Sequence, residues 1–433
     1  MTPSQPGFEG VAFHEGLLCP LSWNNAQALS ALFGQLKPRR LPPQPSFGFG
    51  DRLGLATSGH LRAVEGTGVF PVLAQQSMRE NARTGRTFAD VLTDAIFGAF
   101  QAGWTQGFGA DADHLKSVEE ARRAARLGYT LFTCDPSDFL EPFPPPKLPS
   151  GGQGIPWAEL EKFYLGRNFS VPGLGKLRFQ REELRRIAGK YWRALEFAEE
   201  MHRALREELP HGFDFELSVD ETPTPTTTQE HLFLALELRR RGVELASLAP
   251  RFPGALEKAV DYRGNLEEFR QALRAHVAIA QAFGPYRLSL HSGSDKWSLY
   301  PIFAAETGGL WHVKTAGTSY LVALEVLARA SPTLFREIMV LARARFPEDR
   351  QGYHVHADPE AFPPPQSLKD HELPQLLTIP EARQILHVTY GSVLQRYGED
   401  LKRVLSQHEE EYHQALAEHF GKHLRALGVK GDG

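Results

Sequence analysis

The stretch GFGADADHLKSVEEARRAARLGYTLFTC, residues 107–134, has the pattern of one strand–helix–strand unit. Gly107–Asp111 and Tyr129–Cys134 are short runs typical of strands, and the charged segment between them is typical of a helix that starts after Ser117. Ser117 and Glu120 fit a capping box, in which each side chain binds a free backbone N–H at the start of the helix. Two strands joined in this way predict parallel pairing in an α/β protein.

The same alternation of strand and helix continues along the rest of the chain. Further strand-like runs lie at residues 48–56, 69–75, 213–219, 245–248, 286–291 and 310–315. With the quoted unit they make eight strands separated by helices, which predicts a (β/α)8 TIM-type barrel. A doubly wound open sheet is the alternative. The chain has no Gly-x-Gly-x-x-Gly fingerprint and no Walker sequence, which counts against a nucleotide-binding fold.

The 433 residues exceed what eight strands and their helices require. We assign residues 46–355 to the barrel as the catalytic domain and residues 1–45 to an N-terminal extension. An insertion of about residues 140–210 follows the fourth strand. Residues 356–433 are expected to form a helical C-terminal tail packed on the barrel, with a long charged helix near Glu399–Leu427.

The composition argues against several classes of partner. The net charge is −4 with no long basic stretch, so neither nucleic acid nor an anionic membrane is indicated. Cys19 and Cys134 lie far apart, so we expect a reducing, cytoplasmic location rather than a disulfide framework. Residues 1–10 lack a signal-peptide layout, and no apolar run approaches the ~20 residues of a membrane helix. A small-molecule substrate is therefore expected, and the oligomeric state, a homo-oligomer included, stays open.

The active site of such a barrel lies at the carboxyl ends of its strands, so polar residues at those ends are the candidates. Asp113 and His114 end the third strand. An aspartate beside a histidine offers a base and a metal ligand to one small volume. The alternative is that Asp113 caps the following helix and that His114 is a surface residue.

The fifth and seventh strands also end in polar residues. Glu216, Asp220 and Glu221 end the fifth strand, and carboxylates are costly to bury unpaired. Glu221 at the tip is a candidate acid, base or ligand, and capping of the next loop is the alternative. His291 ends the seventh strand, before a Ser-Gly-Ser-Asp segment and Lys296 whose donors and cation suit an anionic substrate. The alternative for His291 is a structural role.

Other candidates lie on the eighth strand and in the loops. Lys314 falls near the tip of the eighth strand, beside a helix start of the kind that binds carboxylate or phosphate. A structural ion pair inside the barrel is the alternative for Lys314. His312 lies one pleat repeat deeper. Asp261, in the long loop after the sixth strand, can complete a site of two histidines and a carboxylate, and His354 and His356 can also bind metal.

Taken together, these segments resemble the tagaturonate epimerase family, metal-dependent hexuronate epimerases that interconvert tagaturonate and fructuronate. The resemblance spans roughly residues 46–360 and rests on motifs that occur in order along the chain. The motifs are Gly109-Ala-Asp-Ala-Asp-His114-Leu-Lys, Glu216-Leu-Ser-Val-Asp-Glu221, Ala249-Pro-Arg-Phe, Leu290-His-Ser-Gly-Ser-Asp-Lys296 and His312-Val-Lys-Thr-Ala-Gly-Thr318.

The resemblance implies roles for several of these residues. Asp113 corresponds to a proton acceptor beside a metal-binding His114, and His291 corresponds to a further metal ligand. Glu221 corresponds to a proton donor. The implied cofactor is a divalent cation, and two histidines with a carboxylate suit Zn, Mn, Fe, Co or Ni.

The third ligand and the groups that bind the substrate carboxylate are our own assignments. We expect Asp261 to complete the metal site, with His312 in reserve. We expect Lys296 and Lys314 to hold the carboxylate of a hexuronate. The ketoses tagatose and fructose are further candidate substrates.

The two hexuronates differ at a carbon β to the ketone, whose proton the ketone does not acidify. We therefore expect retro-aldol cleavage and re-addition to the other face of the aldehyde, with Asp113 as base and Glu221 as acid. Transient oxidation at the same carbon is the rival mechanism. The alternative functions are a metal-dependent sugar-acid aldolase, a ketose isomerase and a non-catalytic uronate-binding protein.

Overall fold

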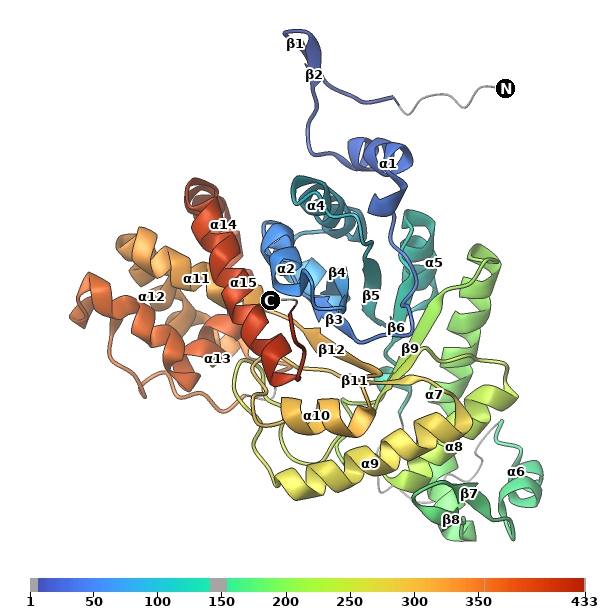
Figure 1. The fold of residues 1–433 in the computed structure, drawn as a ribbon. Coiled ribbons are helices and arrows are strands. Elements are labelled where there is room, and N and C mark those ends of the chain that lie inside the picture. Colours follow the sequence, from blue (N-terminus) through green and yellow to red (C-terminus); the bar gives the residue numbers. More distant parts are fainter. Residues whose placement is uncertain (1–6, 141–153, 354, 432–433) are drawn as a thin grey trace, which may run out of the picture.

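The computed structural model describes residues 7–140, 154–353 and 355–431. Eight parallel strands close into a barrel in the order β10-β11-β12-β3-β4-β5-β6-β9, as Figure 1 shows. The barrel strands are β3 (Ser46–Phe49), β4 (Phe70–Ser77), β5 (Gly109–Leu115), β6 (Leu131–Cys134), β9 (Asp214–Ser218), β10 (Ser247–Ala249), β11 (Arg287–Leu290) and β12 (Trp311–Thr315). The predicted (β/α)8 barrel is confirmed, and the open sheet is excluded.

Helices between the strands surround the barrel. They are α2 (Thr57–Val64), α3 (Met78–Thr84), α4 (Phe88–Gln101), α5 (Val118–Leu127), α7 (Arg181–Glu208), α8 (Thr228–Arg240), α9 (Leu266–Phe283), α10 (Tyr300–Thr307) and α11 (Thr318–Ala330). The capping box expected at Ser117 is present, because its hydroxyl accepts from the Glu120 N–H and the Glu120 carboxylate accepts from the Ser117 N–H. That reciprocal pair explains why α5 begins where the sequence predicts.

The inside of the barrel is polar, whereas barrel interiors are commonly filled with branched apolar side chains. Outside, Phe47 of β3 packs edge-to-face against Phe420 of the C-terminal helix. Inside, a Cβ on Gly48 would lie 1.6 Å from Gln75 Oε1, so any side chain at this position would displace the Gln75 amide. Buried polar side chains that bond one another or the barrel backbone are Ser46, Gln75, Asp111, Asp113, Thr133, Glu216, Ser247, His312 and Lys314.

Two additions precede and interrupt the barrel. The N-terminal one is a hairpin, β1 (Val11–Phe13) and β2 (Gly16–Leu18), followed by α1 (Trp23–Leu32) and the short helix η1 (Gly34–Leu36); the hairpin projects from the body in Figure 1. After β6 come η2 (Ser137–Phe139), α6 (Trp157–Tyr164) and the hairpin β7 (Phe169–Val171) and β8 (Gly175–Leu177). Residues 141–153 of the expected insertion lie outside the described residues. Helix α7 packs between α5 and α8 and so takes the place of the fourth barrel helix.

The C-terminal segment is helical and covers one side of the barrel (Figure 1). Its elements are α12 (Pro332–Asp349), η3 (Pro365–Ser367), η4 (Asp370–Thr378), α13 (Pro380–Val388), α14 (Tyr390–Gln407) and α15 (Glu409–Ala426). The single long helix expected near Glu399–Leu427 is wrong, because the chain breaks at His408. The break lets α15 pack on α2, so closely that a Cβ on Gly59 would lie 2.7 Å from Leu416 Cβ.

Among the described residues, we find no helix that combines the length and the apolar character needed to cross a membrane.

Candidate active site

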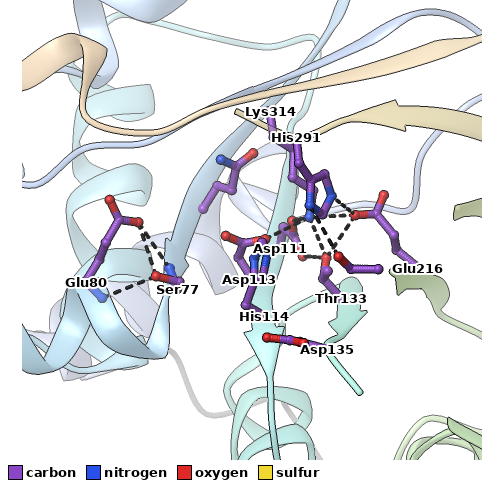
Figure 2. A network of polar contacts seen from close by, with 12 residues as sticks. Ser77, Glu80, Asp111, Asp113, His114, Thr133, Asp135, Glu216, His291 and Lys314 are labelled. Carbon is purple, nitrogen blue, oxygen red and sulfur yellow. Dashed lines mark hydrogen bonds and ion pairs between the residues drawn. The ribbon is translucent and has the colours of Figure 1, made fainter. Parts of the chain in front are cut away.

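Lys314 on β12 is the centre of a buried ion cluster at the carboxyl end of the barrel. Its Nζ lies 2.6 Å from Asp111 Oδ2 and 2.8 Å from both Asp113 Oδ1 and Glu216 Oε1. Figure 2 shows these carboxylates converging around Lys314, and the Lys314 ammonium also donates to the Thr133 hydroxyl at 2.5 Å. Burial opposes the lysine charge, but the carboxylates outweigh it and hold the pKa of Lys314 well above its usual range. The structure thus shows the ion pair inside the barrel that was the alternative for Lys314.

The three carboxylates around Lys314 have different electrostatic surroundings. Burial raises the pKa of Asp111 to about 7, against the opposing effect of Lys314. Burial acts the same way on Asp113, but His114 and Lys314 outweigh it and hold the pKa of Asp113 well below its usual range. Lys314 and His291 likewise outweigh burial and hold the pKa of Glu216 well below its usual range. Asp113 and Glu216 are therefore anions at neutral pH, and Asp111 is the group of the three that holds a proton most readily.

Two histidines lie at the open edge of this cluster. The centroids of the His114 and His291 rings are 5.0 Å apart. His114 Nδ1 lies 2.9 Å from Asp113 Oδ1, and His291 Nε2 lies 2.6 Å from Glu216 Oε1. Each imidazole therefore has a carboxylate on one ring nitrogen, which orients the ring.

Asp220, two residues beyond β9, joins the histidines. Its Oδ1 lies 3.3 Å from His291 Nδ1. Ligand atoms of His114, Asp220 and His291 lie within 4.8 Å of one another, so these residues can hold a metal ion. Two imidazoles and a carboxylate, each imidazole backed by another carboxylate, are a donor set suited to a divalent transition metal.

The structure places Glu221 next to this group but facing solvent. Glu221 is exposed, and its charge acts on Arg79 and Lys116, whose pKa values it helps to raise. The chain turns after β9 ends at Ser218, and in this turn Asp220 faces the histidines whereas Glu221 faces outward. The signal in the sequence that could have identified Asp220 is its place among the carboxylates at the end of the fifth strand.

Asp261 and Lys296 are not brought to the cluster. The Asp261 carboxylate accepts hydrogen bonds from the Ser298 hydroxyl at 3.0 Å and from the N–H of Tyr262 at 2.7 Å. Lys296 is fully buried, and its ammonium donates to three backbone carbonyl groups of the surrounding loops. Burial lowers the pKa of Lys296 to about 7. Both residues hold loops together in this structure.

The two other candidate histidines that the structure describes have partners outside this group. His312 is buried deeper in the barrel, where Nδ1 lies 2.9 Å from Ser46 Oγ and burial lowers its pKa to about 3. His356 Nδ1 lies 2.9 Å from Glu257 Oε1. His354 lies outside the described residues.

Comparisons with known proteins point to a single family. The family model described as tagaturonate epimerase matches residues 5–427. A tagaturonate/fructuronate epimerase from Thermotoga maritima is 46% identical over 427 residues, which cover 97% of this chain and 87% of that protein. The native crystal structure of fructuronate-tagaturonate epimerase UxaE from Cohnella laeviribosi is 37% identical with a TM-score of 0.92, covering 98% of this chain and 89% of that one. A glycerol complex of the same Cohnella protein matches equally well, with a TM-score of 0.92 and 37% identity over 98% of this chain and 89% of that chain.

Proposed function

Because this chain belongs to the tagaturonate epimerase family and is an isomerase-type enzyme of sugar acids, we propose that it interconverts D-tagaturonate and D-fructuronate. These are the two hexuronates in the names of its relatives from Thermotoga maritima and Cohnella laeviribosi. The observation that carries the proposal is the polar cluster at the carboxyl end of the barrel, where Asp113, His114, Asp220, His291 and Lys314 meet.

We propose that His114, Asp220 and His291 hold a divalent cation. The donor set supports this, since each histidine keeps one ring nitrogen on a carboxylate and has the other for the ion. Asp220 takes the place that we first gave to Asp261. Zn, Mn, Fe, Co and Ni all suit these ligands. When bound, such an ion supplies Lewis-acid stabilisation of the negative charge that develops on the ketone oxygen of the substrate.

In the proposed reaction, Asp113 takes the proton from the hydroxyl on the carbon β to the ketone. The bond between that carbon and its neighbour on the ketone side then breaks, which leaves an aldehyde and an enediolate. The aldehyde turns, the same carbon–carbon bond re-forms on its other face, and the new hydroxyl oxygen takes up a proton. Lys314 and His114 keep Asp113 ionised for the first step.

Glu221 is the proposed proton donor for the second half of the reaction. Because the aldehyde turns between the two steps, its oxygen leaves the side of Asp113 and needs an acid on the opposite side of the substrate. Glu221 adjoins Asp220 and is exposed, so it can exchange protons with solvent between turnovers. Asp113 and Glu221 exchange roles in the reverse reaction.

The test is incubation of purified protein with D-tagaturonate labelled with deuterium at the inverted carbon. We expect D-fructuronate that keeps the deuterium, and an aldehyde-trapping reagent should capture cleavage fragments. Loss of the deuterium to solvent without trapped fragments would exclude retro-aldol cleavage, because that route leaves the carbon–deuterium bond intact. Net accumulation of fragments would indicate an aldolase, and binding without turnover would indicate a uronate-binding protein.

A further inference from the structure

The loop between β10 and α9 carries a half-buried lysine with no acidic partner. Lys258 Nζ donates to the Ser292 hydroxyl at 2.7 Å. Across the parts of the chain that the structure describes, no carboxylate lies within ion-pair distance of Lys258. A partly buried cation is normally paired, because withdrawing it from water is otherwise costly. An unpaired one beside an active site is therefore available for an anionic ligand.

The hydrogen-bond partner of Lys258 is next in the chain to a proposed metal ligand. Ser292 directly follows His291, which we propose as a metal ligand. Ser292 has a φ of 51° and Ala259, next to Lys258, has a φ of 61°, both in the left-handed region that non-glycine residues rarely adopt. Backbone held in this region near a site is a sign that the geometry there serves a function.

Buried groups fix the loop that presents Lys258. The Lys296 ammonium donates to the carbonyl of Glu257 at 2.8 Å and to that of Val260 at 2.5 Å, on either side of Lys258. The Arg383 guanidinium of α13 donates to the Ala259 carbonyl at 3.0 Å. Lys258 is thus carried on a rigid support, which is what precise binding of a small anion requires.

The other lysines near the barrel mouth already have partners. Lys314 is surrounded by carboxylates, and Lys296 is fully buried with its donors on backbone carbonyls. Lys116 is exposed and pairs with Asp138 at 3.1 Å. Neither lysine that we first assigned to the substrate carboxylate is free to bind it.

We propose that Lys258, together with the Ser292 hydroxyl, binds the carboxylate of the sugar acid. The proposal rests on the proposed function, because it identifies the group that selects a hexuronate over an uncharged ketose. An ammonium and a hydroxyl both donate to carboxylate oxygens, and a charge-assisted bond of this kind is stronger than a neutral one.

The test compares Lys258→Met, Lys258→Arg and the matched control Lys116→Met. For Lys258→Met we expect KM for D-tagaturonate to rise about 10- to 100-fold, as expected for loss of one charge-assisted hydrogen bond. Lys258→Arg should recover most of the loss, and Lys116→Met should leave KM within about twofold, since an exposed paired lysine contributes little. Binding of D-gluconate, measured by calorimetry, should weaken in parallel, whereas sorbitol, its uncharged counterpart, should bind all these proteins alike.

The calorimetric arm separates this proposal from the proposed function. If the unmutated protein does not convert D-tagaturonate, but its binding of D-gluconate weakens in Lys258→Met, the proposed epimerase activity is contradicted and the lysine assignment is supported. Active enzyme whose KM and D-gluconate affinity are unchanged in Lys258→Met would overturn the lysine assignment alone. The assignment would also fail if Arg251→Met, which alters the other unpaired cation of this loop, produced the loss in place of Lys258→Met.

Discussion

Among the described residues, two clusters have the same composition, two histidines and one aspartate, with ligand atoms close enough to hold a metal. One is His114, Asp220 and His291 at the barrel mouth. The other is Asp295, His419 and His423, between the loop after β11 and helix α15. They differ in which atoms their neighbours already use.

In the second cluster the ligand atoms are taken. Asp295 Oδ2 accepts from the Arg383 guanidinium at 2.6 Å, and Oδ1 lies 3.0 Å from His419 Nε2. His423 Nε2 accepts from the Asp295 N–H at 3.1 Å, while its Nδ1 donates to the His419 carbonyl at 3.0 Å. Burial lowers the pKa of His423 to about 3, so the ring is neutral and fully bonded. This cluster fastens the C-terminal helices to the loop that begins at His291.

In the barrel-mouth cluster the neighbours of the imidazoles are carboxylates, which attract positive charge, and the contact of His291 Nδ1 at 3.3 Å is to Asp220 within the cluster itself. The comparison teaches that composition and proximity alone do not define a metal site. The partners of each ligand atom decide whether it is available.

The largest expected effect is on metal binding, and it comes from replacing a histidine of the barrel-mouth cluster and not one of the second cluster. His291→Ala should lower both bound metal and turnover by more than about 100-fold. This exceeds the loss that is typical when a residue that only supports a metal ligand is replaced. His419→Ala should leave the metal content of the folded protein unchanged. Elemental analysis of both variants after dialysis against the metal measures this. Equal metal loss in the two variants would mean that the ion lies elsewhere.

The next comparison concerns the carboxylate ligand. Asp220→Asn should weaken metal affinity about 10- to 100-fold, because a charged ligand is replaced by a neutral one. The control is Asp261→Asn, which should leave the metal affinity unchanged. In the described structure, the Asp261 carboxylate bonds only Ser298 and Tyr262. Competition with a chromogenic chelator gives both constants. The reverse pattern would restore Asp261 as the third ligand.

A pH dependence should distinguish the clusters further. In the metal-free protein burial lowers the pKa of His291, but Asp220 and Glu216 outweigh it and raise the pKa to about 10. A metal must therefore displace a proton, so its apparent affinity should rise about tenfold per pH unit between roughly pH 7 and the pKa of His291. Calorimetry in buffers of different ionisation enthalpy should detect the released proton. An affinity independent of pH would show that His291 is already neutral.

The smallest effect on activity is expected at the second cluster. Asp295→Ala leaves Arg383 without its buried partner and should lower the free energy of unfolding by about 3 kcal/mol. Turnover per folded, metal-loaded molecule should fall far less than in His291→Ala. Thermal melting gives the stability change, and active-site titration gives the activity. A drop in turnover equal to that of His291→Ala would show that Asp295 has a catalytic role.

The barrel could be predicted from local pattern. Each of the eight expected strand runs overlaps a strand of the barrel, because apolar strand runs and helix caps such as Ser117 act within a few residues. Breaks inside helical patterns were missed. The long helix expected near Glu399–Leu427, for example, divides at His408 into α14 and α15.

The grouping of polar residues at the barrel mouth could be predicted in part, for a related reason. That Asp113, His114 and His291 lie together follows from their places at the ends of strands that the sequence marks clearly. The positions of Asp261 and Lys296 could not be predicted, because their hydrogen-bond partners come from loops that no local pattern reveals. The roles of Asp113 and Glu221 in proton transfer stay predictions.

The most direct test of the account is a metal add-back experiment. Purified protein stripped with a chelator is given D-tagaturonate, and D-fructuronate is followed by nuclear magnetic resonance before and after adding one divalent cation at a time. We predict no epimerisation without metal and rapid formation of D-fructuronate with at least one of Zn, Mn, Fe, Co or Ni. Full conversion by the stripped enzyme, or no conversion with any of these ions, would contradict it.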